Sequence, residues 1–414
     1  VTGVQTCALP ISPLWWGVVV LAFGAVSSVL GVLYALAEHD IKRLLAWHTV
    51  ENIGIILMGV GVGMAGIALH HPVIAAVGLL GALFHLLNHA LFKGLLFLGA
   101  GAIIFRLHTR DMEKMGALAK RMPWTAGAFL IGCLAISAMP PLNGFISEWY
   151  TYQSLFSLTR VDAIIPRLAG PIAIVMLAIT GALAAMCFVK VYGVSFCGNA
   201  RSEKADHARE VPWPMVIAMG LLALFCVLAG VGANLVAPHL LHIAQSLSSQ
   251  ETLAVAQGAT LMPGDAQQAV LTPSVVFLLL IAMPVLPGLF WYINRHTRGN
   301  FRRTGDAWAC GYAWEKGMAP SAGSFTQPLR VVFGPLYRMR KQLDPAQPLQ
   351  RSLGGVTVAA TRTEPFWDDK IILPLVGITK RIARAVQYLQ SGDFRLYCLY
   401  VIAALVILLL TIAV

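Results

Sequence analysis

Three titratable residues recur at four-residue intervals inside an apolar stretch of the chain. His85, His89 and Lys93 occupy positions i, i+4 and i+8 of the segment FHLLNHALFKGLLFLGAGAII. In an α-helix this spacing places the three side chains along one face, with about 6 Å of rise between successive groups. A gap of that size suits one bridging water, and a proton hop needs hydrogen-bond contact either directly or through water. The spacing therefore predicts a proton relay.

A zinc site and a purely structural role are the alternatives for this triplet, and both stay open. A zinc site could use His85 and His89, although HExxH is absent and no nearby Cys, Asp or third His is evident. A structural role, in which the histidines hydrogen-bond between helices, is the ordinary fate of a buried histidine. The relay is favoured because histidine changes its charge near neutral pH and because a lysine charge is costly to keep in an apolar span.

An acidic residue follows a pair of prolines in another apolar stretch. Glu148 lies in PPLNGFISEWYTYQ, shortly after Pro140, Pro141 and Gly144. Prolines remove backbone donors and disfavour helix just before each ring, so we expect a broken helix here. Backbone groups freed at membrane depth are tolerated only where they are buried in protein or line a wet cavity. We interpret Glu148 as a proton-exchange site, with an ion pair that fixes helix packing as the alternative.

Four more ionisable residues are candidates for the same pathway. His48 and Glu51 are three residues apart, share a helical face and lie inside an apolar run. Lys42 stands at the entrance of that run, where an anchor at the cytoplasmic surface explains it equally well. Lys190, in MCFVKVYGVSF, lies near the end of its span, and its ammonium group could instead extend to the membrane interface.

The elements that must position these residues are membrane-spanning helices. Of the 414 residues, 57% are hydrophobic and only 12% are charged, whereas about a quarter of the residues of a soluble domain are charged. Apolar segments of about 20 residues are long enough to cross a bilayer. We expect eight of them, at residues 13–37, 44–66, 73–104, 124–158, 168–196, 212–235, 273–293 and 394–414. The predicted fold class is an all-α polytopic membrane protein in which the prolines break one helix.

The Lys and Arg residues that give the net charge of +11 are distributed along the chain as a membrane topology predicts. Lys and Arg collect in alternate loops, as they do on the cytoplasmic side of membrane proteins, and the loops 67–72 and 236–272 contain neither. The alternation places both chain ends on the outer side and accounts for the positive charge, which argues against nucleic acid as a partner. The seven cysteines show no CxxC pair and no His/Cys cluster, so neither a disulfide scaffold nor a metal or cofactor site is indicated.

The chain divides into five stretches. Residues 1–11 lack the charged region of a signal peptide and are interpreted as a non-native leader on a chain truncated upstream. Residues 12–293 form the main transmembrane domain, 294–370 an extramembrane segment and 393–414 a last transmembrane helix. Residues 371–392 are expected to form an amphipathic helix along the membrane surface or a partner, with an ordinary loop helix as the alternative. Its apolar face consists of Ile371, Leu375, Ile378, Ile382, Val386 and Leu389.

These motifs together resemble a known family. DIKRLLAW followed by HTVENIG, the H-x3-H-x3-K helix and the broken PPLNGFISE helix resemble the antiporter-like subunits of respiratory complex I and of multisubunit sodium/proton antiporters. The sequence is most similar to the large antiporter-like membrane subunit of group 4 membrane-bound hydrogenases, of the hydrogenase-4 component B and formate hydrogenlyase subunit 3 type. GYAWEKGMAPSAGSFTQPL and YLQSGDFRLYCLYV resemble the C-terminal region of that family. The resemblance covers residues 13–414.

The resemblance implies both a fold and a function. It implies inverted repeats with broken helices at the midplane, of which only the second repeat is present. His85, His89 and Lys93 would be the central relay, and Glu148 the terminal titratable residue of the broken helix. The implied function is proton relay in a redox-driven complex of the bacterial inner membrane. Expected partners are other membrane subunits, lipid and a peripheral arm with a nickel–iron hydrogenase and iron–sulfur proteins.

Two further classes of function stay open. Because this chain carries no signature of a redox cofactor, redox chemistry is expected in the partner subunits, and an enzyme label would belong to the complex. A subunit of a multisubunit cation/proton antiporter or of NADH:quinone oxidoreductase is the first alternative, and sodium dependence of transport or the neighbouring genes separate it. A passive scaffold is the second alternative, and it predicts that neutral substitutions lower assembly but spare pumping.

Overall fold

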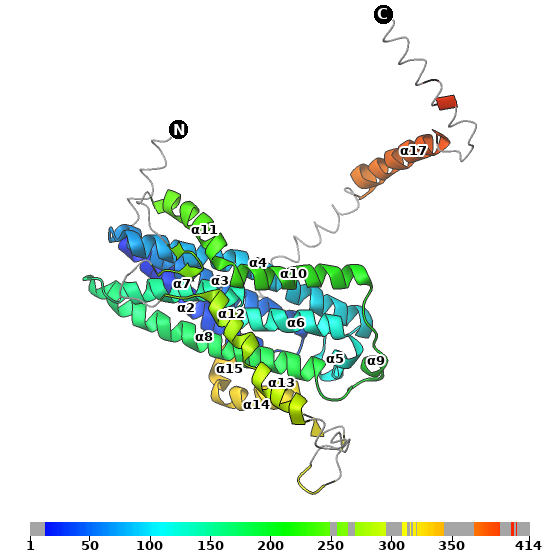
Figure 1. Ribbon diagram of the computed structural model, residues 1–414, viewed down its shortest axis with the longest axis horizontal. Helices are drawn as coiled ribbons and strands as arrows, with labels where there is room; N and C mark the ends of the chain where they lie inside the picture. The colour runs from blue at the N-terminus through cyan, green and yellow to red at the C-terminus, as the bar shows by residue number, and fades with distance from the viewer. Residues whose placement is uncertain are drawn as a thin grey trace, which may run out of the picture. The chain divides into compact units, whose positions relative to one another are not determined.

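The computed structural model describes residues 13–248, 255–263, 270–294, 309–312, 315, 318–319, 321–342, 368–389, 399–400 and 403. The chain divides into two units, Val1–Gly334 and Pro335–Val414. The described part of the first unit is a helical bundle (Figure 1). Its helices are α2 (Leu14–Ala37), α3 (Ile41–Ala68), α4 (Pro72–Leu107), α5 (Leu118–Arg121), α6 (Pro123–Ile136), α7 (Asn143–Leu158), α8 (Ile164–Phe196), α9 (Glu203–Asp206), α10 (Trp213–Val231), α11 (Ala233–Ser248), α12 (Pro273–Ala282), α13 (Val285–Asn294) and α14 (Ala322–Val332), with a 3-10 turn at Met112–Lys114.

The predicted fold of apolar, membrane-spanning helices is confirmed. Six stretches in the described residues are long and apolar enough to cross a membrane, namely Leu14–Ala37, Ile41–Ala68, Pro72–Leu107, Ile164–Phe196, Trp213–Val231 and Pro273–Phe290. The expected span 124–158 is present as two shorter helices, α6 and α7. The expected span 394–414 lies outside the described residues except for 399–400 and 403, and the expected leader 1–11 lies outside them entirely.

The interruption between α6 and α7 falls at the prolines. α6 ends at Ile136 and α7 begins at Asn143, with a cis bond between Pro140 and Pro141 in the connection. Gly144 lies in the first turn of α7, directly against the end of α6, because a Cβ added there would stand 1.9 Å from the Ala135 carbonyl oxygen. Only glycine permits this approach, so the sequence PPLNG both ends one half-helix and lets the next one start beside it.

Helix α4 occupies the centre of the bundle and packs against α3, α6, α7, α10 and α11. α2 covers the other side of α3, and the two backbones touch at Gly24 and Gly54, where an added Cβ would lie 2.7 Å and 2.6 Å from the opposite carbonyl oxygen. Small residues allow this close packing of membrane helices, whose association cannot rely on the hydrophobic effect. Side chains on α3, α4 and α7 therefore meet inside the protein rather than in lipid.

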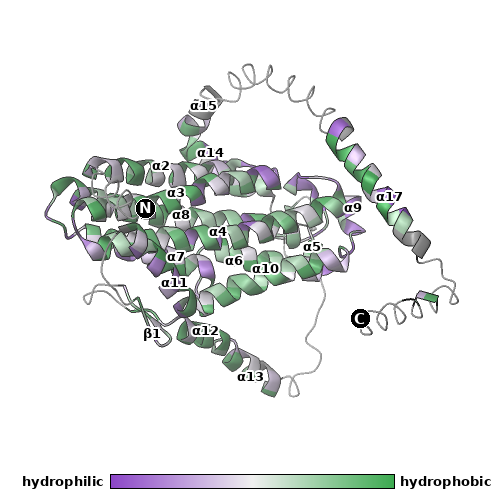
Figure 2. Cartoon of the chain, turned by 90° about the horizontal axis from the view of Figure 1, so that it is seen from above, coloured by the Kyte–Doolittle hydropathy of each residue, from purple (hydrophilic) through white to green (hydrophobic). Residues whose placement is uncertain are grey.

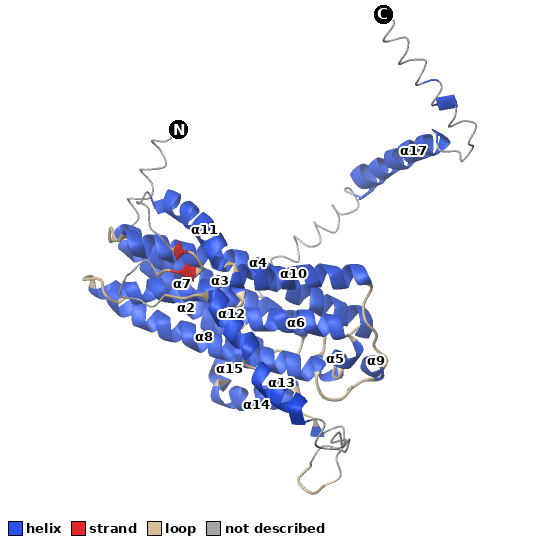
Figure 3. Ribbon diagram, in the orientation of Figure 1, coloured by secondary structure: helices blue, strands red, loops and turns tan. Residues whose placement is uncertain are grey.

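The stretch 236–272, expected to be a loop, contains regular structure. α11 covers its first part, and β1 (Ala256–Gln257) pairs antiparallel with β2 (Thr260–Leu261). Figure 3 shows this hairpin in red beside α7, and the Tyr150 hydroxyl donates to the Val255 carbonyl at 3.1 Å. A search for long apolar runs misses both elements, since α11 is amphipathic and the strands are too short for a pattern. α8 also begins at Ile164, four residues before the expected start at 168.

The described parts of the C-terminal stretches are helical. α14, within the expected extramembrane segment 294–370, packs against α2 and α8. The second unit contains α15 (Gly334–Gln342), whose first residue closes the first unit, a π-helical turn at Asp368–Ile372 and α17 (Leu373–Leu389). α17 carries hydrophilic and hydrophobic residues along its length (Figure 2), and Ile371, Leu375, Ile378 and Ile382 are exposed. The part of the predicted amphipathic helix 371–392 that the structure describes, residues 371–389, is helical, and residues 390–392 lie outside the described residues. Its place on a membrane surface stays a prediction, as do the five boundaries.

Candidate functional site

Helix α3 buries three polar side chains within five consecutive residues. Asp40 fixes the start of the helix, because its carboxylate accepts hydrogen bonds from the backbone N–H groups of Lys42 and Arg43 at 2.8 and 3.1 Å. Further along the helix, His48, Glu51 and Asn52 are at most 1% exposed. His48 Nδ1 contacts the Glu51 carboxylate, so two residues expected to share a helical face are in direct contact.

Histidine 85 of α4 connects α3 to the broken helix. Its Nε2 lies 3.1 Å from the Asn52 side-chain oxygen, and its Nδ1 lies 2.9 Å from the Ser147 hydroxyl of α7. Asn52 in turn donates from Nδ2 to the His48 carbonyl oxygen at 2.6 Å. Ser147 is also within reach of the Gly144 carbonyl oxygen, at 3.0 Å. These contacts form a polar chain, defined here as His48, Glu51, Asn52, His85 and Ser147, that joins three helices inside the bundle.

Lysine 93 is buried on the same helix, about two turns beyond His85. Its side chain is 5% exposed, and the ammonium group donates to the Leu45 carbonyl oxygen of α3 at 2.5 Å. It also lies 5.9 Å above the Phe97 ring and interacts electrostatically with Glu51. Lys93 therefore interacts electrostatically with the His48–Glu51 pair of the polar chain.

Histidine 89 is only half-buried, although it stands between His85 and Lys93 in the sequence. Its ring contacts Phe92 edge-on at 5.7 Å, and its Nε2 has no hydrogen-bond partner among the described residues. Four residues of an α-helix turn through about 400°, so positions i and i+8 differ by about 80° around the axis. For this reason His85, His89 and Lys93 share one side of α4 without touching one another.

Glutamate 148 follows Ser147 on α7 and is 6% exposed. A Cβ added to Gly181 of α8 would stand 4.0 Å from its Oε2, so the carboxyl group faces a glycine of α8. Glu148 interacts electrostatically with Glu51 and with Tyr152. No ion pair in the described part of the chain includes Glu148, so a salt bridge that fixes helix packing finds no partner here.

Of the two remaining candidate lysines, Lys190 interacts electrostatically with His48 of the polar chain. Lys190 of α8 is fully buried, and its ammonium group donates to the carbonyl oxygens of Leu36 and Glu38 at 2.8 and 3.0 Å, at the C-terminal end of α2. Lys42 is partly exposed in the first turn of α3, as an anchor at the surface would be.

Sequence reasoning missed the uncharged members of the site. Asn52 and Ser147 complete the hydrogen bonds of His85, while Asn88 donates to the Asn143 carbonyl oxygen at 2.7 Å, where α7 begins. The signal was present, because each of these residues is an uncharged polar group in an apolar span, and such groups are usually hydrogen-bonded between helices. Within the residues that the structure describes, no group of three or more His, Cys, Asp or Glu side chains could hold a metal ion.

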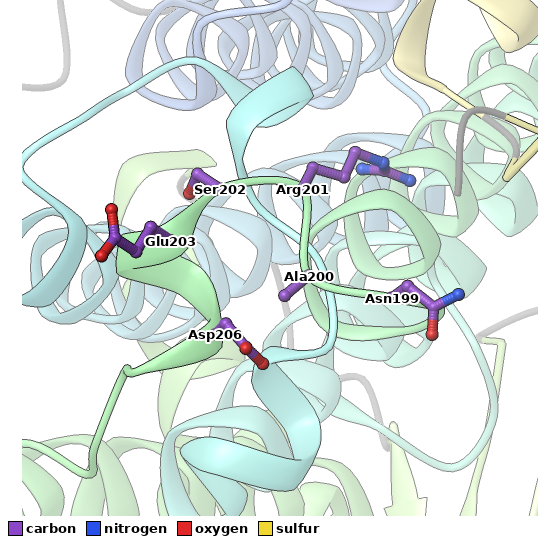
Figure 4. Close-up of a pocket in the computed structure, with 6 residues that line it drawn as sticks. All are labelled: Asn199, Ala200, Arg201, Ser202, Glu203 and Asp206. Atoms are coloured by element: carbon purple, nitrogen blue, oxygen red, sulfur yellow. The ribbon is translucent and has the colours of Figure 1, made fainter. Parts of the chain in front are cut away.

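A pocket of about 360 Å³ lies outside the long spans, away from the buried polar chain. It is lined by Asn199, Ala200, Arg201, Ser202, Glu203 and Asp206 (Figure 4). Arg201 and Glu203 point in opposite directions from the loop in this view, and Arg201 donates to the Val194 carbonyl oxygen at 2.8 Å. Because Ser202 and Asp206 also bond to neighbouring segments, these groups hold the connection between α8 and α10 and do not form the candidate site.

Comparison with known proteins finds similar membrane subunits. The model of the family described as "NADH:quinone oxidoreductase/Mrp antiporter, TM" matches residues 3–176, which include α2 to α7 and the whole polar chain. The chain is 65% identical over 402 residues to hydrogenase-4 component B of Escherichia coli (strain K12), a match that covers 97% of this chain and 60% of that protein. The chain is a multi-pass membrane protein and is similar to these antiporter-like membrane subunits.

Two further comparisons agree with this family. The chain is 45% identical over 334 residues to formate hydrogenlyase subunit 3 of the same organism, covering 81% of this chain and 52% of that protein. Its fold is similar to that of a chain in the structure of the membrane-bound sulfane sulfur reductase, an archaeal respiratory membrane complex. That match has a TM-score of 0.63 and 21% identity and covers 95% of this chain and 56% of the other. The chain therefore spans between half and two thirds of the length of these relatives.

Proposed function

We propose that this chain relays protons as part of an antiporter-like membrane subunit of a redox-driven complex in the bacterial inner membrane. The observation that carries the proposal is the polar chain, which links the His48–Glu51 pair on α3 to His85 on α4 and to Ser147 on the broken helix. Ionisable side chains inside membrane spans are costly, each by roughly 2.5–3.5 kcal/mol on insertion scales, and they are usually retained for a function. Here they occur on adjacent helices and face one another.

The arrangement supports a division of roles among these residues. Glu51 contacts His48 and interacts electrostatically with Lys93. A proton gained or lost by any of the three therefore changes the electrostatic energy of the other two. His85 stands between α3 and the broken helix, where Glu148 is the next ionisable group. A change of charge in a neighbouring subunit would alter the proton affinity of Lys93 and drive exchange through His89 and His85 toward Glu148.

The names of the relatives support a membrane-bound hydrogenase as the complex. One relative is named as a component of hydrogenase-4 and the other as a subunit of a formate hydrogenlyase. On this proposal, this chain's partners are other membrane subunits and, through them, a peripheral arm with a nickel–iron hydrogenase and iron–sulfur proteins. Lipid surrounds the spans. The redox reaction belongs to that arm, and this chain contributes the proton path.

Substitution of Lys93 tests the relay. We expect Lys93→Ala to lower proton pumping by the assembled complex more than tenfold, as loss of a group that transfers protons typically costs about 100-fold or more. Lys204→Ala is the matched control, because Lys204 is exposed in the short helix α9, outside the polar chain. Pumping is measured in membrane vesicles at equal redox turnover and equal amounts of assembled complex. Unchanged pumping by Lys93→Ala would refute the relay, and a loss that poor assembly fully accounts for would favour the passive scaffold.

A subunit of a multisubunit cation/proton antiporter is the second candidate function. The description of the matching family includes the Mrp antiporter, and the match covers the polar chain. Such a subunit needs no redox partner, and its transport would depend on sodium or another cation. Proton transport that requires sodium and proceeds without redox turnover would favour this candidate over the hydrogenase-type complex, as would neighbouring genes for small antiporter subunits.

A further inference from the structure

The side chain of His85 has a hydrogen-bond partner on each ring nitrogen, and the chemistry of the two partners determines where its proton lies. Nε2 faces the side-chain oxygen of Asn52 at 3.1 Å, and Nδ1 faces the hydroxyl of Ser147 at 2.9 Å. All three side chains are at most 1% exposed, so bulk water does not compete for these bonds. A neutral imidazole has one N–H donor and one acceptor nitrogen, and the tautomer follows from which neighbour can only accept.

The orientation of Asn52 is fixed by α3. Its other side-chain atom lies 2.6 Å from the His48 carbonyl oxygen, which can only accept a hydrogen bond. The atom at that position must therefore be the amide nitrogen, and the amide oxygen must face His85. Because that oxygen can only accept, the proton of neutral His85 belongs on Nε2.

Nδ1 of neutral His85 is then an acceptor, and Ser147 is its donor. The Ser147 hydroxyl carries one proton and has two other acceptors within reach, the carbonyl oxygens of Gly144 at 3.0 Å and of Asn143 at 3.4 Å. When His85 gains a proton on Nδ1, that nitrogen becomes a donor to Ser147 Oγ. The hydroxyl must then turn away and donate to one of these carbonyl oxygens, of which Gly144 is the nearer, in the first turn after the helix break. Both protonation states of His85 thus keep all their hydrogen bonds.

We propose that Asn52 and Ser147 are positioning residues of the proton relay, which hold neutral His85 as the Nε2–H tautomer and direct its second proton to Nδ1, on the side of the broken helix. The proposal rests on the proposed function, since it assigns a direction to proton uptake by a relay residue. Asn52 carries no proton that it can pass on, so exchange at His85 proceeds on the Ser147 side. Protonation of His85 is thereby coupled to a hydrogen bond at Gly144, near Glu148 on the same helix.

The tautomer of His85 is the decisive measurement. Histidine is labelled with ¹⁵N in the complete protein within its assembled complex, and the solid-state NMR signals lost in His85→Gln identify His85. We expect a protonated Nε2 and an unprotonated Nδ1 for the neutral ring. In Asn52→Leu, Nε2 loses its acceptor and Ser147 Oγ remains, so the proton should move to Nδ1. A wild-type proton on Nδ1, or an unchanged tautomer in Asn52→Leu, would overturn the proposal.

Pumping by Ser147 variants provides a readout that does not depend on Asn52→Leu folding correctly. Ser147→Ala removes the acceptor for the Nδ1 proton, and loss of one such hydrogen bond lowers the rate about fivefold. Ser154→Ala is the matched control, because Ser154 is equally buried on the same helix and donates within α7, to the Thr151 carbonyl oxygen at 2.8 Å. Equal pumping by the two variants at equal assembly would contradict the proposal.

The two proposals fail in different ways. If His85→Gln pumps like the wild type, His85 is not part of the relay and the proposed function is wrong at this residue. If His85→Gln abolishes pumping while Ser147→Ala and Ser154→Ala pump alike, the relay stands and only the positioning role of Ser147 is refuted.

Discussion

Two lysines are buried in this bundle, and their surroundings differ. Lys190 donates to the carbonyl oxygens of Leu36 and Glu38 at the C-terminal end of α2, where the last carbonyls of a helix lack intrahelical partners and the helix dipole favours a cation. Lys93 donates to the carbonyl oxygen of Leu45, which also accepts from the Thr49 hydroxyl at 3.2 Å. The ammonium group of Lys190 therefore has two carbonyl acceptors at a helix end, whereas that of Lys93 shares one carbonyl oxygen with Thr49.

The neighbours of the two lysines extend this difference. Lys93 interacts with Glu51, which contacts His48, so a change of charge on any one of the three acts on the other two. Lys190 interacts with Glu38 and Glu113, which belong to the connections outside the spans, and also with Cys187 and His48. A buried lysine alone thus says little about function. What separates the two lysines is that Lys93 interacts with Glu51 of the polar chain, whereas the hydrogen bonds of Lys190 go to the end of α2.

The largest effect is expected from Glu51→Gln, which tests the relay side of this comparison. Glutamine keeps the size of the side chain but cannot ionise, so it removes the charge that Glu51 can present to His48 and Lys93. We expect pumping to fall tenfold or more, because a group that transfers protons typically contributes about 100-fold or more. The measurement is proton pumping per redox turnover in vesicles.

Glu203→Gln is the control for this substitution, since Glu203 is exposed in the short helix α9. If Glu51→Gln pumped at the wild-type rate, the electrostatic link between Glu51 and Lys93 would have no role in transport, and the two buried lysines would no longer differ in function.

An intermediate effect is expected from Lys190→Met, which tests the structural side. Methionine fills a similar volume but leaves the carbonyl oxygens of Leu36 and Glu38 without this donor, and an unsatisfied buried acceptor costs about 1–3 kcal/mol. We expect a lower thermal denaturation temperature of the purified complex and normal pumping by the fraction that assembles. Lys42→Met is the control. A complex that is as stable as the wild type but has lost pumping would instead assign Lys190 to the pathway.

The sequence alone predicted the helices of the site well. The apolar runs predicted α3, α4 and the broken pair α6 and α7, and the spacing of His48 and Glu51 predicted that they share a helical face. It could not predict which helix lies beside which at the level of single hydrogen bonds. The Asn52 and Ser147 contacts to His85 join positions 33 and 62 residues apart, and no local periodicity encodes such pairs.

The same limit explains why the H-x3-H-x3-K spacing did not predict the different surroundings of His85, His89 and Lys93. The spacing placed His85, His89 and Lys93 on one side of α4, yet the drift of about 40° for every four residues separates their environments. His85 is held by α3 and α7, Lys93 by Leu45, and His89 is half-buried with a free Nε2 among the described residues. Proton transfer along α4, directly or through a single water, therefore stays a prediction of the sequence spacing.

The smallest effect is expected from Arg330→Ala, and it sharpens the contrast at the end of α2. Arg330 of α14 donates to the Ala37 carbonyl oxygen at 3.2 Å, one residue from each carbonyl that Lys190 binds. Arg330 is exposed, so water replaces its hydrogen bond when the side chain is removed. We expect the stability of the complex to fall by less than about 1 kcal/mol, with pumping unchanged, as measured by thermal denaturation beside Lys190→Met. A loss of stability equal to that of Lys190→Met would show that burial of the cation does not determine how much its hydrogen bond stabilises this helix end.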